Sequence, residues 1–158
     1  MTKKRDLTRE KIVAAALALV DAEGLAALSM RRLAGVLNVE APSLYNHLNG
    51  KEALFDLLVE GVMAQVPLPD PGKDWQGALR GHYLGFYDAL MAHPWVSGLI
   101  VARPNMGPHM LMRIEAVLAV LARAGFAPVA ADQAWNALDA MLHGHALLKL
   151  SFPLKPDE

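Results

Sequence analysis

The sequence predicts an all-α protein in two parts: an N-terminal helix-turn-helix domain of three helices, followed by a second helical domain. Apolar residues recur at spacings of three and four, and no segment shows the strict alternation expected of a half-buried strand. Glycines and prolines interrupt this pattern at intervals of about one helix length. Three prolines and a glycine between positions 67 and 72 separate the two parts.

The first predicted helix runs from Thr8 to Gly24. The Thr8 hydroxyl can accept a hydrogen bond from the first turn, and Gly24 can end the helix because glycine adopts left-handed backbone conformations. Between them, apolar residues follow the spacing of one buried helix face. These residues are Ile12, Ala15, Ala16, Leu19 and Val20.

The second predicted helix is short, begins after Ser29 as its cap and ends before Asn38, which enters the left-handed region readily. Its expected buried face consists of Leu33, Val36 and Leu37.

A third short helix is predicted over residues 40–47, with Pro42 in its first turn, where proline is tolerated. A fourth helix begins near Asn49, because Glu52 follows three residues later as in a capping box. Leucines then repeat at helical spacing.

In the second part, helices are predicted over residues 75–93, 109–124 and 128–150. The segment 95–108 contains two prolines and two glycines and is expected to be irregular. We therefore divide the chain into a helix-turn-helix domain over residues 1–52, a connecting helix over 53–66 and a second domain over 67–158.

Two short helices packed on a longer one make a helix-turn-helix, whose second helix enters the major groove of DNA. Arg31 and Arg32 open the first short helix, where a guanidinium can reach a phosphate or a guanine. Lys51 begins the next helix, where it can hold a phosphate. The alternative is a solvated polar face on a helical interaction protein without DNA binding, which a gel-shift assay distinguishes. The second short helix and its end carry groups that fit a groove: Ala41, Ser43, Tyr45, Asn46 and His47.

Charge and composition narrow the classes of partner. Residues 1–52 hold eight Lys/Arg and six Asp/Glu, a balance of +2, whereas residues 53–158 hold seven and ten, a balance of −3. The apolar content of 54% exceeds what a small core needs and predicts a helical partner surface. No apolar run reaches the roughly 18 residues of a membrane span, so no membrane partner is expected.

The absence of cysteine fits a reducing cytoplasm and excludes disulfides and thiolate metal sites.

Residues 8–58 resemble the DNA-binding domain of the TetR family of bacterial transcriptional repressors, through the Leu44-Tyr45-x-His47 core and Lys51-Glu52. Residues 74–126 are similar to the tetracycline repressor subgroup through "DWQ", "GFYDAL", "ARP" and "ARAGF". The resemblance implies a repressor that a small-molecule effector releases from operator DNA. It places these residues at DNA-contacting positions: Arg31, Ala41, Pro42, Ser43, Tyr45, Asn46, His47 and Lys51.

Two of these positions differ from the tetracycline repressors. Ala41 stands where they carry a base-reading glutamine, and Asn46 where they carry a tryptophan. We therefore expect a different operator sequence.

The resemblance also implies an effector pocket in the second domain. Tetracycline repressors bind the drug with magnesium through two histidines, whose positions correspond here to Leu99 and Val66. We therefore predict a small, largely apolar effector, with neither metal nor cofactor. By motif position the pocket includes His82, Phe86, Leu99 and Arg103, the last of which can equally cap a helix. Helical spacing adds residues for which core packing is the alternative: Met63, Met110, Trp135, Leu138, Met141 and His145.

The sequence contains no catalytic motif, and His143 and His145 lie two residues apart, a spacing that points them in different directions on a helix. We therefore expect neither an enzyme nor a metal site.

The segment from Pro128 to Leu150 is predicted to form a homodimer, because Asp132, Asp139 and Lys149 are its only charged residues. A two-fold dimer predicts a near-palindromic operator. One apolar stripe can cover the domain's own core, while an adjoining one meets the partner; the alternative is a helix surrounded on all sides within its own domain. The family usually continues with one or two further helices in the dimer interface, and the sequence alone does not decide whether this chain is complete at its C-terminus. The two stripes are Ala131, Trp135, Leu138 and Leu142, and Ala134, Leu138, Met141 and His145.

Overall fold

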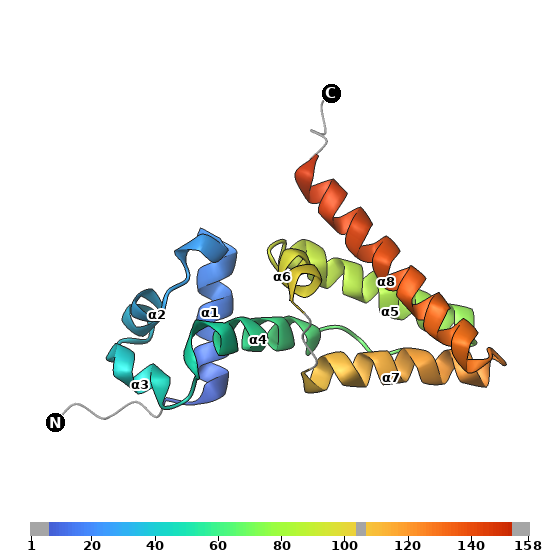
Figure 1. Ribbon diagram of the computed structural model, residues 1–158, viewed down its shortest axis with the longest axis horizontal. Coiled ribbons are helices and arrows are strands. Elements are labelled where there is room, and N and C mark those ends of the chain that lie inside the picture. Colours follow the sequence, from blue (N-terminus) through green and yellow to red (C-terminus); the bar gives the residue numbers. More distant parts are fainter. Residues whose placement is uncertain (1–6, 104–106, 153–158) are drawn as a thin grey trace. The chain divides into compact units, whose positions relative to one another are not determined.

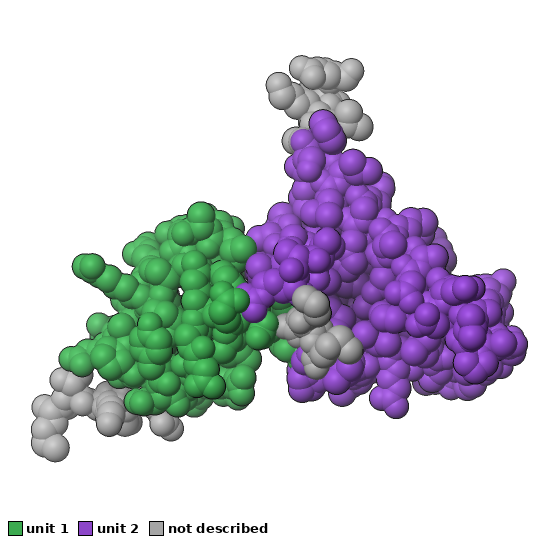
Figure 2. Space-filling view, viewed as in Figure 1, with its two compact units in different colours: residues 1–61 green, residues 62–158 purple. Residues whose placement is uncertain are grey.

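The computed structural model of the protein describes residues 7–103 and 107–152, and all regular structure within them is helical (Figure 1). The expected all-α fold is therefore confirmed. The chain divides into two compact units, residues 1–61 (unit 1) and residues 62–158 (unit 2) (Figure 2). The division falls in the last turn of α4.

Unit 1 contains the predicted helix-turn-helix. Thr8 accepts a hydrogen bond from the backbone N–H of Lys11 (3.4 Å), and Ser29 accepts one from that of Arg32 (3.1 Å), so both predicted caps are present. Asn38 has φ 54° and ψ 49°, the left-handed conformation expected after the second helix. The elements are α1 (Arg9–Glu23), the 3-10 turn η1 (Leu25–Ala27), α2 (Met30–Leu37), α3 (Ala41–Tyr45) and α4 (Gly50–Met63).

The predicted buried face of α1 is confirmed at Ile12, Ala16, Leu19 and Val20, while Ala15 is half-buried; that of α2 is partly wrong. Val36 is 48% exposed, whereas Met30, Leu33 and Ala34 are buried. At 3.6 residues per turn these three side chains share one side of the helix, and Val36 lies off that side. The inward face of α2 therefore begins one turn earlier than the sequence indicated.

Helix α4 passes very close to α1 at Gly61. A Cβ atom at this position would lie 2.8 Å from Val13 Cγ1 and 3.1 Å from Leu17 Cδ1. Because contacts this short require the neighbours to move, glycine is what allows the two helices to approach. The close packing fixes α4, and with it Lys51, against the rest of unit 1.

Unit 2 is a helical bundle built on α5, α7 and α8, which pack against one another in pairs. Asp74 caps α5 by accepting a hydrogen bond from the backbone N–H of Gly77 (2.6 Å). The helices are α5 (Trp75–Ala92), α6 (Val96–Ala102), α7 (Pro108–Arg123) and α8 (Pro128–Ser151). A buried cluster joins α5, α7 and α8: Ala78, Leu79, Val117, Val120, Leu121 and Ala131.

The prediction that residues 95–108 are irregular is wrong, because α6 lies within them. Val96, Ser97 and Leu99 are buried, and α6 contacts α8. Burial of these residues offsets the low helix propensity of Gly98, a tertiary effect that local sequence does not reveal. No helix in the described part of the chain combines the length and apolar character needed to cross a bilayer.

Candidate functional site

The first candidate site is the surface of unit 1 around α3. Leu44 and Leu48 hold this segment in the core, with exposed fractions of 0% and 3%. Because these leucines point inward, Tyr45, Asn46 and His47 are exposed to solvent, Tyr45 by 55%. Pro42 is also exposed, and Ala41 and Ser43 are half-buried.

α3 is shorter than the predicted helix. It ends at Tyr45, and Asn46 and His47 lie in the turn that follows. The backbone N–H of His47 donates to the Leu44 carbonyl at 3.0 Å, which holds the turn in place. Tyr45, Asn46 and His47 are therefore consecutive and exposed, and the buried Leu44 and Leu48 hold their backbone against the core of unit 1.

The two arginines of α2 differ in their surroundings. Both are exposed, but Arg32 Nη2 donates to Glu23 Oε1 at 2.6 Å and so links the start of α2 to the end of α1. The hydrogen bond and charge of Glu23 raise the pKa of Arg32. A phosphate that binds Arg32 has to share this guanidinium with Glu23.

Lys51 occupies the first turn of α4 and is exposed. Its ammonium nitrogen lies 5.2 Å from the centroid of the Phe55 ring, a cation–π contact one turn along the helix. The contact restrains the side chain near the amino end of the helix, where anions bind favourably.

The residues predicted to form an effector pocket separate into two groups in unit 2. Five lie in its interior, each less than a tenth exposed, whereas Met141 on α8 is 67% exposed and His145 is also exposed. Trp135 and Leu138 are half-buried and pack on the α5–α7–α8 cluster. Arg103 follows α6, and its backbone N–H donates to the Leu99 carbonyl at 3.0 Å. The interior five are Met63, His82, Phe86, Leu99 and Met110.

Two members of the interior group, Phe86 and Met110, lie against an ion pair whose arginine is buried. Arg113 on α7 donates to both carboxylate oxygens of Asp139 on α8, at 3.1 Å and 2.5 Å, and its side chain is 2% exposed. The Tyr83 hydroxyl on α5 donates to Asp139 Oδ1 at 2.8 Å. Burial and the neighbouring carboxylate raise the pKa of Tyr83, so its hydroxyl stays protonated.

Phe86 lies at the middle of this arrangement. The Arg113 guanidinium carbon is 4.6 Å from its ring centroid, and the His143 ring packs edge-on against it at 5.5 Å. The His82 ring is 6.3 Å away. We call this set the polar centre: Tyr83, His82, Arg113, Asp139 and His143 around Phe86.

Both histidines of the polar centre are neutral groups. Burial lowers the pKa of His82, and burial also lowers the pKa of His143, because the charged form of each ring loses its hydration. His82 Nδ1 lies 2.6 Å from the carbonyl oxygen of Pro67. The same segment approaches α5 at Gly85, where a Cβ atom would collide with Pro67 Cγ. The segment that follows α4 therefore contacts the polar centre through Pro67.

The polar centre also contains buried polar atoms for which the described residues supply no hydrogen-bond partner. They are His82 Nε2, Arg113 Nε and His143 Nδ1, with Ser97 Oγ and Trp135 Nε1 elsewhere in unit 2. Such atoms are costly in an apolar interior, so each points to a further partner.

Sequence reasoning missed Arg113, Asp139 and Tyr83 as site residues. A signal was available, because Arg113 interrupts the apolar stripe of Met110 and Val117, and Asp139 is one of three charges on α8. A charge on a buried helix face requires a partner, although the sequence does not say which.

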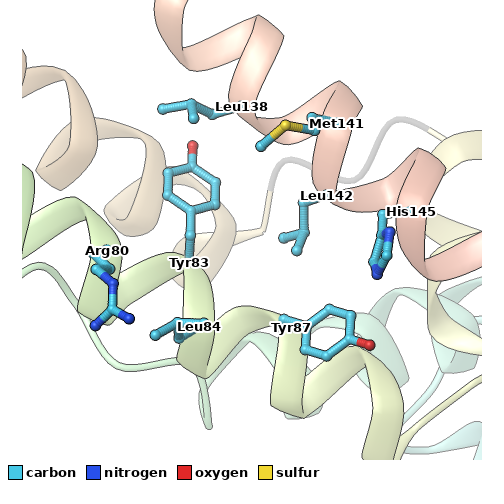
Figure 3. Close-up of a pocket in the computed structure, with 8 residues that line it drawn as sticks. All are labelled: Arg80, Tyr83, Leu84, Tyr87, Leu138, Met141, Leu142 and His145. Atoms are coloured by element: carbon cyan, nitrogen blue, oxygen red, sulfur yellow. The ribbon is translucent and has the colours of Figure 1, made fainter.

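A groove that shares Tyr83 with the polar centre lies between α5 and α8, with a volume of about 510 Å³ (Figure 3). Its lining is mostly apolar and includes three residues predicted for the effector pocket. We call it the α5–α8 groove. It is lined by Arg80, Tyr83, Leu84, Tyr87, Leu138, Met141, Leu142 and His145.

The described residues, 7–103 and 107–152, contain no group of three or more His, Asp or Glu side chains that could hold a metal ion. Val66 and Leu99 are buried apolar residues.

Two family models match this chain. "Bacterial regulatory proteins, tetR family" matches residues 12–58, and "Tetracyclin repressor-like, C-terminal domain" matches residues 68–152. The first match contains α2 and α3, and the second contains the polar centre.

Individual proteins are also similar. An HTH-type transcriptional regulator of Saccharopolyspora erythraea is 41% identical over 76% of this chain and 51% of its own length. The class E tetracycline repressor of Escherichia coli is 34% identical over 76% of this chain and 58% of its own. The chain thus spans about half the length of these curated relatives. The crystal structure of the Streptomyces coelicolor TetR family protein ActR in complex with actinorhodin has a TM-score of 0.85 and 32% identity, covering 93% of this chain and 70% of that one.

Proposed function

The chain belongs to the TetR family of bacterial regulatory proteins, and we propose that it is a DNA-binding transcriptional repressor released from its operator by a small-molecule effector. The observation that carries the proposal is the outward polar surface of Tyr45, Asn46 and His47 over the buried Leu44 and Leu48. Polar groups grouped at the end of a helix that is itself anchored are suited to base edges and phosphates. Such a regulator acts in the cytoplasm, where the chromosome lies.

Selection from random duplex DNA tests the proposal. A two-fold dimer presents two recognition helices, so the enriched sequences form a near-palindrome. A protein in which Tyr45 and Lys51 are both replaced by alanine is the matched control and enriches nothing. Absence of enrichment with the unaltered protein favours the alternative, a helical interaction protein without DNA binding.

The proposed effector is small, largely apolar and bound without a divalent ion. Buried Leu99 and Val66 support this, because neither side chain can coordinate a cation. Phe86 and the rings beside it favour an aromatic molecule. ActR, a structurally similar protein, has been crystallised in complex with actinorhodin, which supports a ligand-responsive regulator here. A thermal-shift screen with and without magnesium tests the proposal: stabilisation by tetracycline only when magnesium is present contradicts it.

The proposed assembly is a homodimer through α8. Five small or apolar residues at helical spacing on α8 are exposed, and Met141 and Leu148 among them are 67% and 62% exposed. A face of this kind supports association, since monomers rarely leave such patches uncovered. Ala134, by contrast, packs on the core of unit 2. The exposed face of α8 proposed as the interface consists of Ala137, Ala140, Met141, Gly144 and Leu148.

Sedimentation at micromolar concentration tests the dimer. Ala137→Glu puts a charge on the proposed interface and shifts the protein to a monomer of 17.1 kDa. Ala119→Glu, the same substitution at an exposed alanine on α7, is the control and leaves the dimer intact. A monomer for the unaltered protein at every concentration contradicts the proposal.

A further inference from the structure

The two arginines of α2 differ in the charge that they present to DNA. Arg31 and Arg32 both lie in the first turn of the helix and are exposed. Arg32 Nη2 donates to Glu23 Oε1 at 2.6 Å, whereas the Arg31 side chain has no ion-pair or hydrogen-bond partner within residues 7–103 and 107–152. Arg31 therefore presents a full positive charge, while a carboxylate already neutralises that of Arg32.

The backbone holds Glu23 and Arg32 close to each other. Glu23 is the last residue of α1, and the chain turns at Gly24, whose φ of 82° favours glycine. Leu28 is 1% exposed and anchors the turn in the core, and Ser29 accepts a hydrogen bond from the backbone N–H of Arg32 at 3.1 Å. The side chains therefore form a charge-assisted hydrogen bond between two backbone segments that are already in place.

The ion pair lies on the helix that is expected to meet DNA phosphates. The first helix of a helix-turn-helix crosses the DNA backbone, and α2 is this helix. Its inward face is formed by Met30, Leu33 and Ala34, so Arg32 lies outside the core, with 54% of its side chain exposed. The Glu23 carboxylate therefore contacts the guanidinium that a phosphate would otherwise contact.

A phosphate and the Glu23 carboxylate compete for Arg32 because both are anions. The two anions repel each other, and the Arg32–Glu23 pair has no net charge with which to attract a phosphate. Counterion release, which drives sequence-independent DNA binding, also requires a cation that is not already neutralised. Exposed ion pairs are weak, so a phosphate can displace Glu23, but the displacement consumes part of the binding free energy.

We propose that Glu23 competes with DNA phosphate for Arg32 and so lowers the affinity of the protein for every duplex. This inference rests on the proposed DNA-binding function. Because a phosphate contact carries no sequence information, the affinities for operator and scrambled DNA are lowered by the same factor. A purely structural role of the ion pair predicts the opposite result, because its loss would then loosen α2 and weaken binding.

Glu23→Gln tests the proposal in the full chain. Glutamine keeps an oxygen that can accept from Arg32 but carries no charge. Fluorescence anisotropy measures the affinity for the selected near-palindromic duplex and for a scrambled duplex between about 50 and 200 mM salt. We expect both affinities to rise about three- to tenfold at moderate salt, and the plot of log affinity against log salt to become steeper by about 0.9. The ratio of the two affinities should stay unchanged.

Three further variants separate competition from a general loss of negative charge. Asp21→Asn removes the same charge from an exposed residue of the same helix, but two residues away, where the side chain points in another direction. It should change both affinities by less than about twofold. Glu23→Gln should have an equally small effect in an Arg32→Gln background, where no guanidinium is released, and its full effect in an Arg31→Gln background. Circular dichroism confirms that each variant is folded.

Weaker DNA binding by Glu23→Gln, or an unchanged salt slope, overturns the proposal. An equal gain in the Arg32→Gln background or from Asp21→Asn also overturns it, because the effect is then general repulsion between acidic residues and DNA. If the unaltered protein prefers the selected duplex and Glu23→Gln shows no gain, the proposed function stands and only this inference falls. If the unaltered protein binds neither duplex, both fall.

Discussion

Units 1 and 2 both bury apolar residues, but they differ in whether they also bury polar ones. In unit 1, Leu44 is buried and Tyr45 beside it is exposed, whereas in unit 2 Arg113 is buried in an ion pair with the half-buried Asp139. The buried polar side chains among the described residues, His82, Ser97, Arg113 and His143, all lie in unit 2. An exposed polar group keeps its hydration, while a buried one depends on its partners. Substitutions of polar residues in unit 1 should therefore change binding alone, and those in unit 2 should change stability as well.

The largest effect is expected from breaking the buried ion pair. Arg113→Met alone leaves the half-buried Asp139 carboxylate without a cation and with Tyr83 as a remaining hydrogen-bond donor, and the free energy of unfolding should fall by about 3 kcal/mol. Arg113→Met/Asp139→Asn removes both charges and should recover most of this loss. Urea unfolding followed by circular dichroism measures both. If the single variant loses less than about 1 kcal/mol, the pair is not desolvated as described.

Asn46→Ala tests whether an exposed polar residue of unit 1 affects DNA binding without affecting stability. Asn46 is exposed, so the free energy of unfolding should change by less than about 0.5 kcal/mol. Discrimination at one base pair of each half-site should weaken by about 1–3 kcal/mol if Asn46 reads a base edge. Competition binding with single-base operator variants measures this. A uniform loss over all sequences would instead assign Asn46 to phosphate contact.

Tyr45→Ala and Lys51→Ala should each weaken binding to every duplex by about tenfold, because a phosphate contact carries no sequence information. Lys51→Ala should also reduce the salt slope of the affinity by about one. Lys73→Ala, an exposed lysine of unit 2, is the control and should leave DNA affinity unchanged. Fluorescence anisotropy provides the readout. A sequence-dependent loss in Lys51→Ala runs against this prediction.

The smallest expected effect is on the pH dependence of the free energy of unfolding. Burial lowers the pKa of His82 below the value of about 6.5 expected in the unfolded chain, so the unfolded state binds more protons at acidic pH. Stability is therefore fully present above about pH 6.5 and falls as pH decreases below it. His82→Gln keeps an amide donor for Pro67 but cannot titrate, and it should flatten this slope. Urea unfolding between pH 7 and 5 measures the slope of the unfolding free energy against pH. An unchanged slope in His82→Gln would show that His82 does not contribute to the pH dependence of stability.

Local signals were enough to predict the helices of unit 1. Thr8, Ser29 and Asn38 act on backbone groups within a few residues of themselves, so sequence proximity reveals them. Helix α6 was missed because burial of Val96 and Leu99, not local propensity, stabilises it.

The polar centre could not be assembled from sequence because its members are distant along the chain. Arg113 and Asp139 are 26 residues apart, and Tyr83 and Asp139 are 56 apart. The positions of Met141 and His145 illustrate the same limit, since helical spacing relates them to Leu138 but does not say whether their shared side faces a core or a groove.

The affinity of the protein for a selected near-palindromic duplex, compared with a scrambled duplex of the same composition, tests the central claim most directly. Fluorescence anisotropy at several salt concentrations gives the dissociation constants for both duplexes. We expect the selected duplex to bind at least about a thousandfold more tightly at moderate salt, with the logarithm of both affinities falling linearly with that of the salt concentration. Equal affinity for the two duplexes would contradict the claim that the surface around α3 reads DNA sequence.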